Sequence, residues 1–289
     1  MNLMDLFVKI SVDDQASSQV ETLSGKLKNG LATAAKVGAS AVVAAGAAIV
    51  AIGKQAVEQY AEYEQLVGGA ELMFGDAYDF VAEKAKNAYS AVQMSQNEYL
   101  KQVNGFATGL KTALGGNEQA AAELADKIIS AEADVVAATG NSQEAVQNAF
   151  NGIMKSNYTM LDNLQIGITP TKEGFQEVID KVNEWNAANG KATNYVIDNL
   201  ADAQSALVDY IKMQGLQGYA ANEAANTIQG SLASMKSAYE NFVAGLGDQN
   251  ADIAELSTKL FTSSSKFALS SATPVSRFCH ALFMEAKEP

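Results

Sequence analysis

Hydrophobic residues recur at helical spacing, in blocks separated by capping residues and glycines, from about Tyr60 to Asn250. Ser95, with Glu98 three residues later, forms a capping-box pattern that predicts the start of a helix. This helix is expected to stop at 115–116, where two glycines follow one another. Asn117 is expected to begin the next helix, which ends at Gly140. The middle of the chain therefore predicts a multi-helix body.

Three further helix starts and two connections complete the prediction for the body. We expect Asp76 to cap a helix that runs to about Val92, Asn141 with Glu144 to form a second capping box, and Thr169 to cap a helix that begins at Pro170. Residues 156–170 have no helical period and are expected to form a long loop, and a glycine-containing connection is expected at 215–218.

The N-terminal region has two different patterns. Leu6, Val8, Ile10 and Val12 alternate with other residues, which predicts a short strand. A long helix is then expected from about residue 15 to residue 65. Its first part carries a heptad-like seam of apolar side chains at spacings of three and four: Val20, Leu23, Leu27 and Leu31.

The second part of this long helix is rich in alanine and glycine. Residues 37–53, between Lys36 and Lys54, form an uncharged run that reaches roughly 26 Å as a helix, against about 30 Å for the hydrocarbon core of a membrane. Gly38, Gly46 and Gly53 fall on one side of such a helix and form a strip where another backbone can approach closely. This strip fits a buried helix in a monomer and an association between copies equally well, and a membrane span remains a third interpretation.

Charge separates the body from its flanks. The net charge of −13 is carried by residues 63–262, which hold 25 acidic residues and 12 lysines. Such an acidic surface is a poor partner for phosphate backbones, so we expect no sequence-specific nucleic-acid binding. Residues 263–289 differ in composition: they contain every arginine, cysteine and histidine of the chain, they are rich in serine, and they lose the helical period. We interpret this segment as an anomalous tail of different origin, such as a frame shift.

The sequence contains few residues that could support catalysis or metal binding. The only cysteine and the only histidine are Cys279 and His280, both in the tail, so the body has neither a histidine-based catalytic triad nor a His/Cys metal cluster. Acidic pairs four residues apart, such as Glu173 with Glu177, are interpreted as exposed helix faces, and Trp185 as a core anchor near a helix end. We therefore predict a protein that is not an enzyme and that uses no cofactor or metal.

Four stretches of the chain resemble one family, the tail tape-measure proteins of long-tailed bacteriophages and prophages of Gram-positive bacteria. The resemblance covers about residues 5 to 250, in order, and corresponds to the N-terminal part of those proteins. The stretches are EYEQLVGGAELMFGD (62–76), GFATGLKTALGG (105–116), NAFNGIMKSNYTMLDNLQIGITPTKEG (148–174) and TIQGSLASMKSAYENFVAGLGD (227–248).

The resemblance implies a structural protein that sets tail length and takes part in tail assembly and genome ejection. It implies a location in the lumen of the virion tail tube after synthesis in the cytoplasm of the bacterial host. The implied partners are further copies through the N-terminal helix, the tail tube, tail assembly chaperones, distal tail proteins and, during ejection, the host membrane. Members of the family are normally much longer, so we expect this chain to be a truncated form. The competing hypothesis is a stand-alone membrane-active or pore-forming helical protein, for which residues 63–289 supply no second apolar segment of sufficient length.

Together these patterns predict an all-α fold with a short N-terminal strand. We expect residues 1–62 to form the strand and the long apolar coiled-coil-like helix, residues 63–250 to form the helical tape-measure body, and residues 251–289 to form a truncated end with the anomalous tail.

Overall fold

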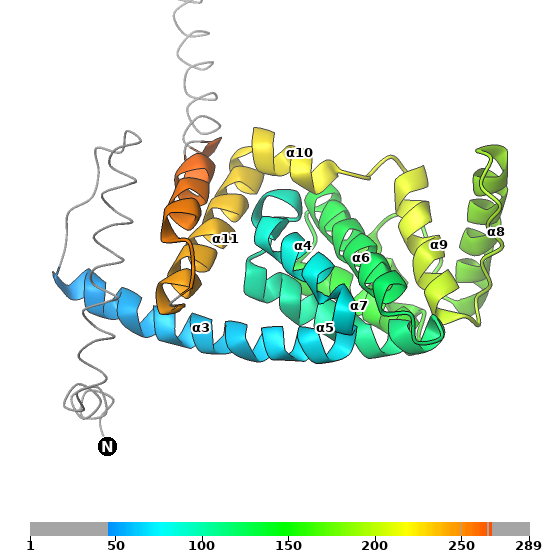
Figure 1. Ribbon diagram of the computed structural model, residues 1–289. Helices are drawn as coiled ribbons and strands as arrows, with labels where there is room; N and C mark the ends of the chain where they lie inside the picture. The colour runs from blue at the N-terminus through cyan, green and yellow to red at the C-terminus, as the bar shows by residue number, and fades with distance from the viewer. Residues whose placement is uncertain (1–45, 249, 265, 268–289) are drawn as a thin grey trace, which may run out of the picture.

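The computed structural model describes residues 46–248, 250–264 and 266–267 (Figure 1). These residues form α-helices and short 3-10 helices, and within the described ranges there is no strand, so this part of the chain is all-α as predicted. The strand expected at residues 6–12 lies outside the described residues. The elements run in the order α3 (Gly46–Phe74), η1 (Gly75–Ala77), α4 (Tyr78–Ala91), α5 (Gln96–Ala113), α6 (Glu118–Thr139), α7 (Gln143–Met154), η2 (Thr159–Leu164), α8 (Lys172–Ala188), α9 (Leu200–Met213), α10 (Tyr219–Asn226) and α11 (Ile228–Gly247). A further helix follows at 253–264.

The predicted helix ends are correct where a residue within one turn of the helix end decides them. The Ser95 hydroxyl accepts a hydrogen bond from the Glu98 amide, and the Glu98 carboxylate accepts one from the Ser95 amide at 2.8 Å, which completes the capping box of α5. Asn117 caps α6, and Gly140 ends it with a left-handed backbone, φ 73°. This is the conformation that favours glycine at a helix C-terminus.

Three expected caps are wrong. The helix expected to start at Asp76 begins as η1 instead, and α4 follows it without a side-chain cap. The cap of α7 is Ser142, because the Asn141 side chain is used elsewhere: its Oδ1 accepts a hydrogen bond from Gln165 Nε2 at 3.1 Å, and its Nδ2 donates to the Asn163 carbonyl at 2.6 Å. The cap of α8 is Thr171 and not Thr169. The stretch 156–170 is also not entirely a loop, since it contains η2.

The helix α3 is the longest described element and runs along one side of the molecule, beneath α4, α5 and α11 (Figure 1). It continues without interruption across residues 62 and 63, where we placed a domain boundary, and ends at Phe74 rather than near residue 65. The first part of the expected long helix, before residue 46, lies outside the described residues.

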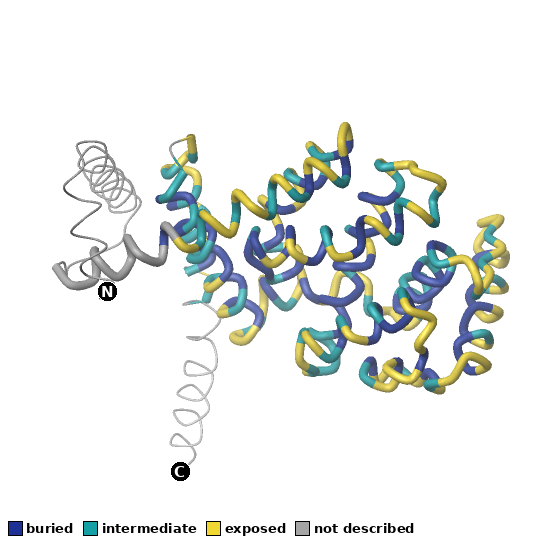
Figure 2. Tube along the Cα trace, turned by 90° about the horizontal axis from the view of Figure 1, so that it is seen from below, coloured by how far each residue is buried: buried dark blue, intermediate teal, exposed yellow. Residues whose placement is uncertain are grey.

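The main core surrounds α6, which is buried along most of its length and packs against α5, α7, α9 and α10. In Figure 2 the buried positions follow the inward faces of these central helices. The largest fully buried side chains of this core are Tyr99, Phe74, Phe106, Phe150 and Phe175. Trp185, expected to anchor the core, is instead only partly buried at the end of α8, with the Lys191 ammonium 5.9 Å from its ring centre.

A second, smaller core joins α3, α11 and the 253–264 helix. It consists of Ala56, Phe242, Val243 and Leu246, with Leu256 among the partly buried residues around it. The 253–264 helix, assigned by sequence to the truncated end, therefore packs on the body.

Candidate interaction surfaces

The predicted helix-packing seam falls only partly within the described residues. Gly46 and Gly53 lie on α3, where a separation of seven residues places them on the same side of the helix. The other predicted seam residues, Gly38, Val20, Leu23, Leu27 and Leu31, lie outside the described residues. The seam thus remains a prediction, with its last two glycines carried by a helix.

Part of α3 is covered by α11 at a close helix–helix contact. A Cβ atom added to Gly247 would lie 2.5 Å from the Cβ of Tyr60 and 3.0 Å from the carbonyl oxygen of Ala56. Further along α3, Gly68 and Leu72 lie four residues apart on an exposed face, where Leu72 is 82% exposed. One side of α3 is therefore used inside this chain and another remains open to solvent.

The helix α11 has a second apolar face that sequence reasoning missed. Leu232 is 45% exposed and Ile228 is 42% exposed, although Phe242, Val243 and Leu246 of the same helix are buried on another side. The exposed side opens into an apolar groove with a cavity volume of about 680 Å³. The groove is lined by Gln229, Leu232, Ala233, Met235, Lys236, Tyr239, Leu260 and Ser264. The sequence signal that could have predicted this face is the presence of apolar residues on two sides of α11, because a helix with one packed side needs only one apolar stripe.

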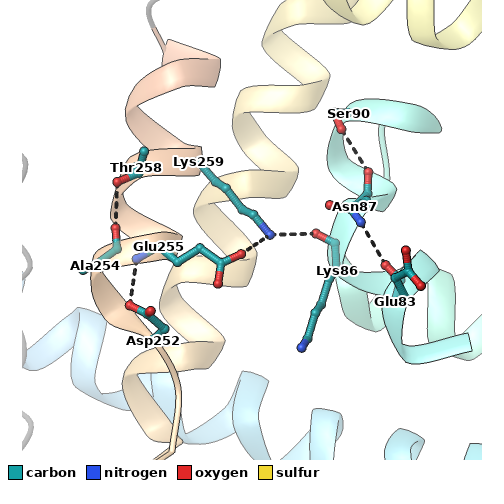
Figure 3. A network of polar contacts seen from close by, with 9 residues as sticks. All are labelled: Glu83, Lys86, Asn87, Ser90, Asp252, Ala254, Glu255, Thr258 and Lys259. Atoms are coloured by element: carbon teal, nitrogen blue, oxygen red, sulfur yellow. Dashed lines mark hydrogen bonds and ion pairs between the residues drawn. The ribbon is translucent and has the colours of Figure 1, made fainter. Parts of the chain in front are cut away.

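The 253–264 helix forms the other wall of this groove, and a hydrogen bond from Lys259 joins it to α4 (Figure 3). The Lys259 ammonium lies 2.8 Å from a Glu255 carboxylate oxygen and donates to the Lys86 carbonyl at 3.4 Å. Asp252 accepts a hydrogen bond from the Glu255 amide at 2.9 Å and so caps the start of the helix. The Lys259–Lys86 hydrogen bond and the apolar contacts of the second core hold this wall of the groove against the body.

A polar cleft of about 430 Å³ lies between α6 and α9. It is lined by three lysines and three aspartates, among other residues: Lys127, Lys191, Lys212, Asp126, Asp134 and Asp209. The aspartates already have partners within the chain: Asp209, for example, accepts hydrogen bonds from the Asn186 amide at 2.7 Å and the Tyr195 hydroxyl at 3.1 Å. Burial, together with Asp209, raises the pKa of Tyr195, so this phenol stays protonated. The charges balance, and the cleft shows no excess of either sign.

Two acidic side chains of α6 are buried. Asp134 accepts hydrogen bonds from the Gly218 amide at 2.8 Å and the Ala220 amide at 2.9 Å, and so holds the start of α10. Burial raises the pKa of Asp134, and these hydrogen bonds oppose the shift. Glu132 is completely buried, and neither carboxylate oxygen has a hydrogen-bond partner. Burial alone raises its pKa well above the ordinary value. Sequence reasoning did not predict this burial, because Glu132 stands in a run with the pattern of an ordinary amphipathic helix.

No arrangement among the described residues indicates catalysis or metal binding. No group of three or more His, Cys, Asp or Glu side chains in residues 46–267, where described, is placed to hold a metal ion. The acidic pairs behave as surface charges: Glu173 and Glu177 are both exposed on α8, and Asp198 forms a surface ion pair with Lys172 at 3.0 Å. Cys279 and His280 lie outside the described residues.

Among the described helices, none combines the length and the apolar character that a membrane crossing needs. Comparisons with protein-family models, with curated proteins and with solved structures gave no significant match.

Proposed function

We propose that this chain is the N-terminal part of a phage tail tape-measure protein and acts as a structural component of the tail. The observation that carries the proposal is that each stretch with a family resemblance contains a helix end of the fold. Residues 148–174 span the second half of α7, all of η2 and the start of α8, and residues 227–248 span α11 with both of its caps.

The glycines of these stretches occupy positions where the fold leaves no room for a side chain. A Cβ added to Gly152 would lie 2.6 Å from the Asn157 carbonyl oxygen, and one added to Gly174 would lie 2.5 Å from the Thr169 carbonyl oxygen. A Cβ added to Gly230 would collide with the backbone of Glu223, and one added to Gly247 would collide with the side chain of Tyr60. Such contacts are far below normal separations, so these glycines are requirements of the fold. The stretches that carry the resemblance therefore contain residues that this fold requires.

The proposed role is structural. Further copies associate through the N-terminal helix, and the chain lies in the tail tube lumen with the tube, assembly chaperones and distal tail proteins as partners. It takes part in tail length determination, tail assembly and genome ejection, when its apolar N-terminal run meets the host membrane. The acidic body suits a protein that leaves the tube ahead of DNA, because its net negative charge disfavours binding to phosphates.

The alternative, a stand-alone membrane-active protein, is favoured by one feature, the uncharged run at 37–53. A paired experiment distinguishes the two functions. A tail protein is found by mass spectrometry in purified phage tails and leaves dye-loaded vesicles of bacterial lipids intact at neutral pH. Efficient vesicle leakage by the purified full chain, together with its absence from tails, would reject the proposal in favour of the membrane-active protein.

The homo-oligomer has its own test. Replacing Gly46 and Gly53 together by leucine puts side chains onto the predicted strip, so the full chain is expected to sediment as a smaller or weaker oligomer. Gly105→Leu is the control, since Gly105 lies exposed on α5 with nothing within 4 Å of an added Cβ. A full chain that is monomeric with or without the substitutions rules the seam out.

A further inference from the structure

The apolar groove of α11 is a channel between two helices. Leu256 of the 253–264 helix lies against Gly245, so the two helices touch near the C-terminal end of α11. Further along, Leu260 of the 253–264 helix lines the groove together with Tyr239 and Leu232 of α11. The groove therefore extends from the helix contact towards the N-terminal end of α11, where Leu232 stays 45% exposed.

The groove has the size of a small-molecule site. Its volume of about 680 Å³ lies within the range of roughly 300–1,000 Å³ that ligand pockets occupy. A specific protein interface buries more than about 1,000 Å² in total, whereas α11 exposes two large apolar side chains here, Ile228 and Leu232. This surface is too small to hold a second copy of the chain stably. A ligand with one narrow apolar body fits it better.

The charge of the groove comes from a single lysine. Lys236 is the one charged residue among the described residues of the lining, and the others are apolar or neutral. Lys236 is exposed, and its ammonium forms no hydrogen bond or ion pair with another described residue. The Glu240 carboxylate, one turn along α11, attracts this ammonium but is itself hydrogen-bonded to Ser95 of α5. An apolar channel with an available ammonium at its rim is complementary to a negative head group.

The acidic body does not prevent such binding. The chain has a net charge of −13, but no acidic residue lines the groove within the described ranges. At physiological ionic strength, exposed charges more than about 8 Å away are largely screened. The burial of methylene groups is the main source of affinity for an alkyl chain, and it does not depend on the net charge.

We propose that this groove binds a single-chain amphiphile with an anionic head group, of which a fatty acid is the simplest example. The alkyl chain lies along Leu232, Met235 and Leu260, and the head group meets the Lys236 ammonium at the rim. The flexible lysine side chain lets the ammonium follow the head group. The proposal is independent of the proposed tail function, since it rests on one surface of this chain.

Titration calorimetry of the purified full chain with dodecanoate, kept below the concentration at which micelles form, tests the proposal. We expect saturable binding, and we expect decanoate to bind several-fold more weakly because it buries fewer methylenes. Dodecyltrimethylammonium has the same alkyl chain and a cationic head group, and it should bind about fivefold or more weakly than dodecanoate. Absence of saturable binding, or equal affinity for the two head groups, would overturn the proposal.

Two substitutions locate the binding site. Leu232→Ser should weaken dodecanoate binding by about tenfold, and Lys236→Gln by about two- to fivefold. Leu72→Ser on α3 and Lys101→Gln on α5 are the matched controls and should leave binding unchanged. All four side chains are exposed, so the fold should be retained, which far-UV circular dichroism checks. Equal losses in the variants and their controls, or no loss in either variant, would contradict the assigned site.

Two other occupants of the groove give different results. A second copy would appear in sedimentation as a dimer that Leu232→Ser abolishes, in a chain that does not bind dodecanoate. A membrane surface would appear as binding to vesicles of anionic lipids by a chain that does not bind dissolved dodecanoate. Either result would overturn the proposal.

Discussion

Replacing Glu132 should stabilise this protein, and the gain should grow with pH. The side chain is fully buried on α6, in the centre of the main core, and neither carboxylate oxygen has a hydrogen-bond partner. A charged carboxylate in such a place lacks the solvation it has in the unfolded chain, which is why its pKa is raised. Glu132→Leu removes the ionisable group and keeps an apolar side chain of similar size.

The sign and size follow from proton linkage. Since the pKa of Glu132 is higher in the folded state than its ordinary value of 4.5, the folded protein binds more protons above that pH. The stabilisation that this extra proton binding gives the folded state is fully present below pH 4.5. As the pH rises from 4.5 towards the raised pKa, about 1.4 kcal/mol of it is lost per pH unit. The advantage of Glu132→Leu over the unmodified chain at pH 7, relative to pH 4.5, therefore has an upper limit of about 3.4 kcal/mol.

Urea unfolding followed by far-UV circular dichroism, at several pH values from 4.5 to 8, measures this difference. Burial also raises the pKa of Asp134 and of Glu240, so the unmodified chain should lose stability with pH more steeply than Glu132 alone requires. Subtracting the two proteins at each pH isolates Glu132. Glu123→Gln, at an exposed position on the same helix, should leave the pH dependence unchanged. Parallel pH profiles for Glu132→Leu and the unmodified chain would refute the reasoning.

Two further predictions use matched pairs and the same unfolding assay. Gly152→Ala should destabilise the protein by roughly 1–3 kcal/mol, because the added Cβ would collide with a backbone oxygen, whereas Gly105→Ala on the exposed face of α5 should stabilise it by about 0.5–1 kcal/mol. Similar effects of the two substitutions would mean that Gly152 is not confined. Ser95→Ala should cost about 1 kcal/mol through loss of the capping box, whereas Asp76→Ala should change stability by less than about 0.5 kcal/mol because Asp76 caps nothing; an equal loss would contradict the assigned caps.

Local signals in the sequence predicted the helices well where the deciding contacts are close along the chain. The capping box of Ser95 and the left-handed Gly140 each depend on residues within one turn. The cap expected at Asn141 was wrong because its side-chain oxygen accepts a hydrogen bond from Gln165, 24 positions away, which leaves Ser142 to cap α7. No local pattern reports a contact at that distance. Similarly, η2 has no apolar period that distinguishes it from a loop.

The surfaces were harder to predict than the helices. The body of α11 was recognised as a helix, but the groove depends on which of its two apolar sides the neighbouring helices leave open, and Leu232 carries no mark of this in the sequence. The burial of Glu132 likewise depends on α6 being surrounded on nearly all sides. Both features arise from tertiary packing, which periodicity along one helix does not describe.

The central claim, a structural role in a phage tail, is tested most directly by tail length. The measurement is electron microscopy of particles induced from the bacterial strain that carries this gene, with and without an in-frame deletion of the codons for residues 63–250, followed by restoration of the gene. The account predicts that the deletion gives particles whose tails are missing or shorter, and that restoring the gene restores the original length. Tails of unchanged length and number after the deletion would contradict it.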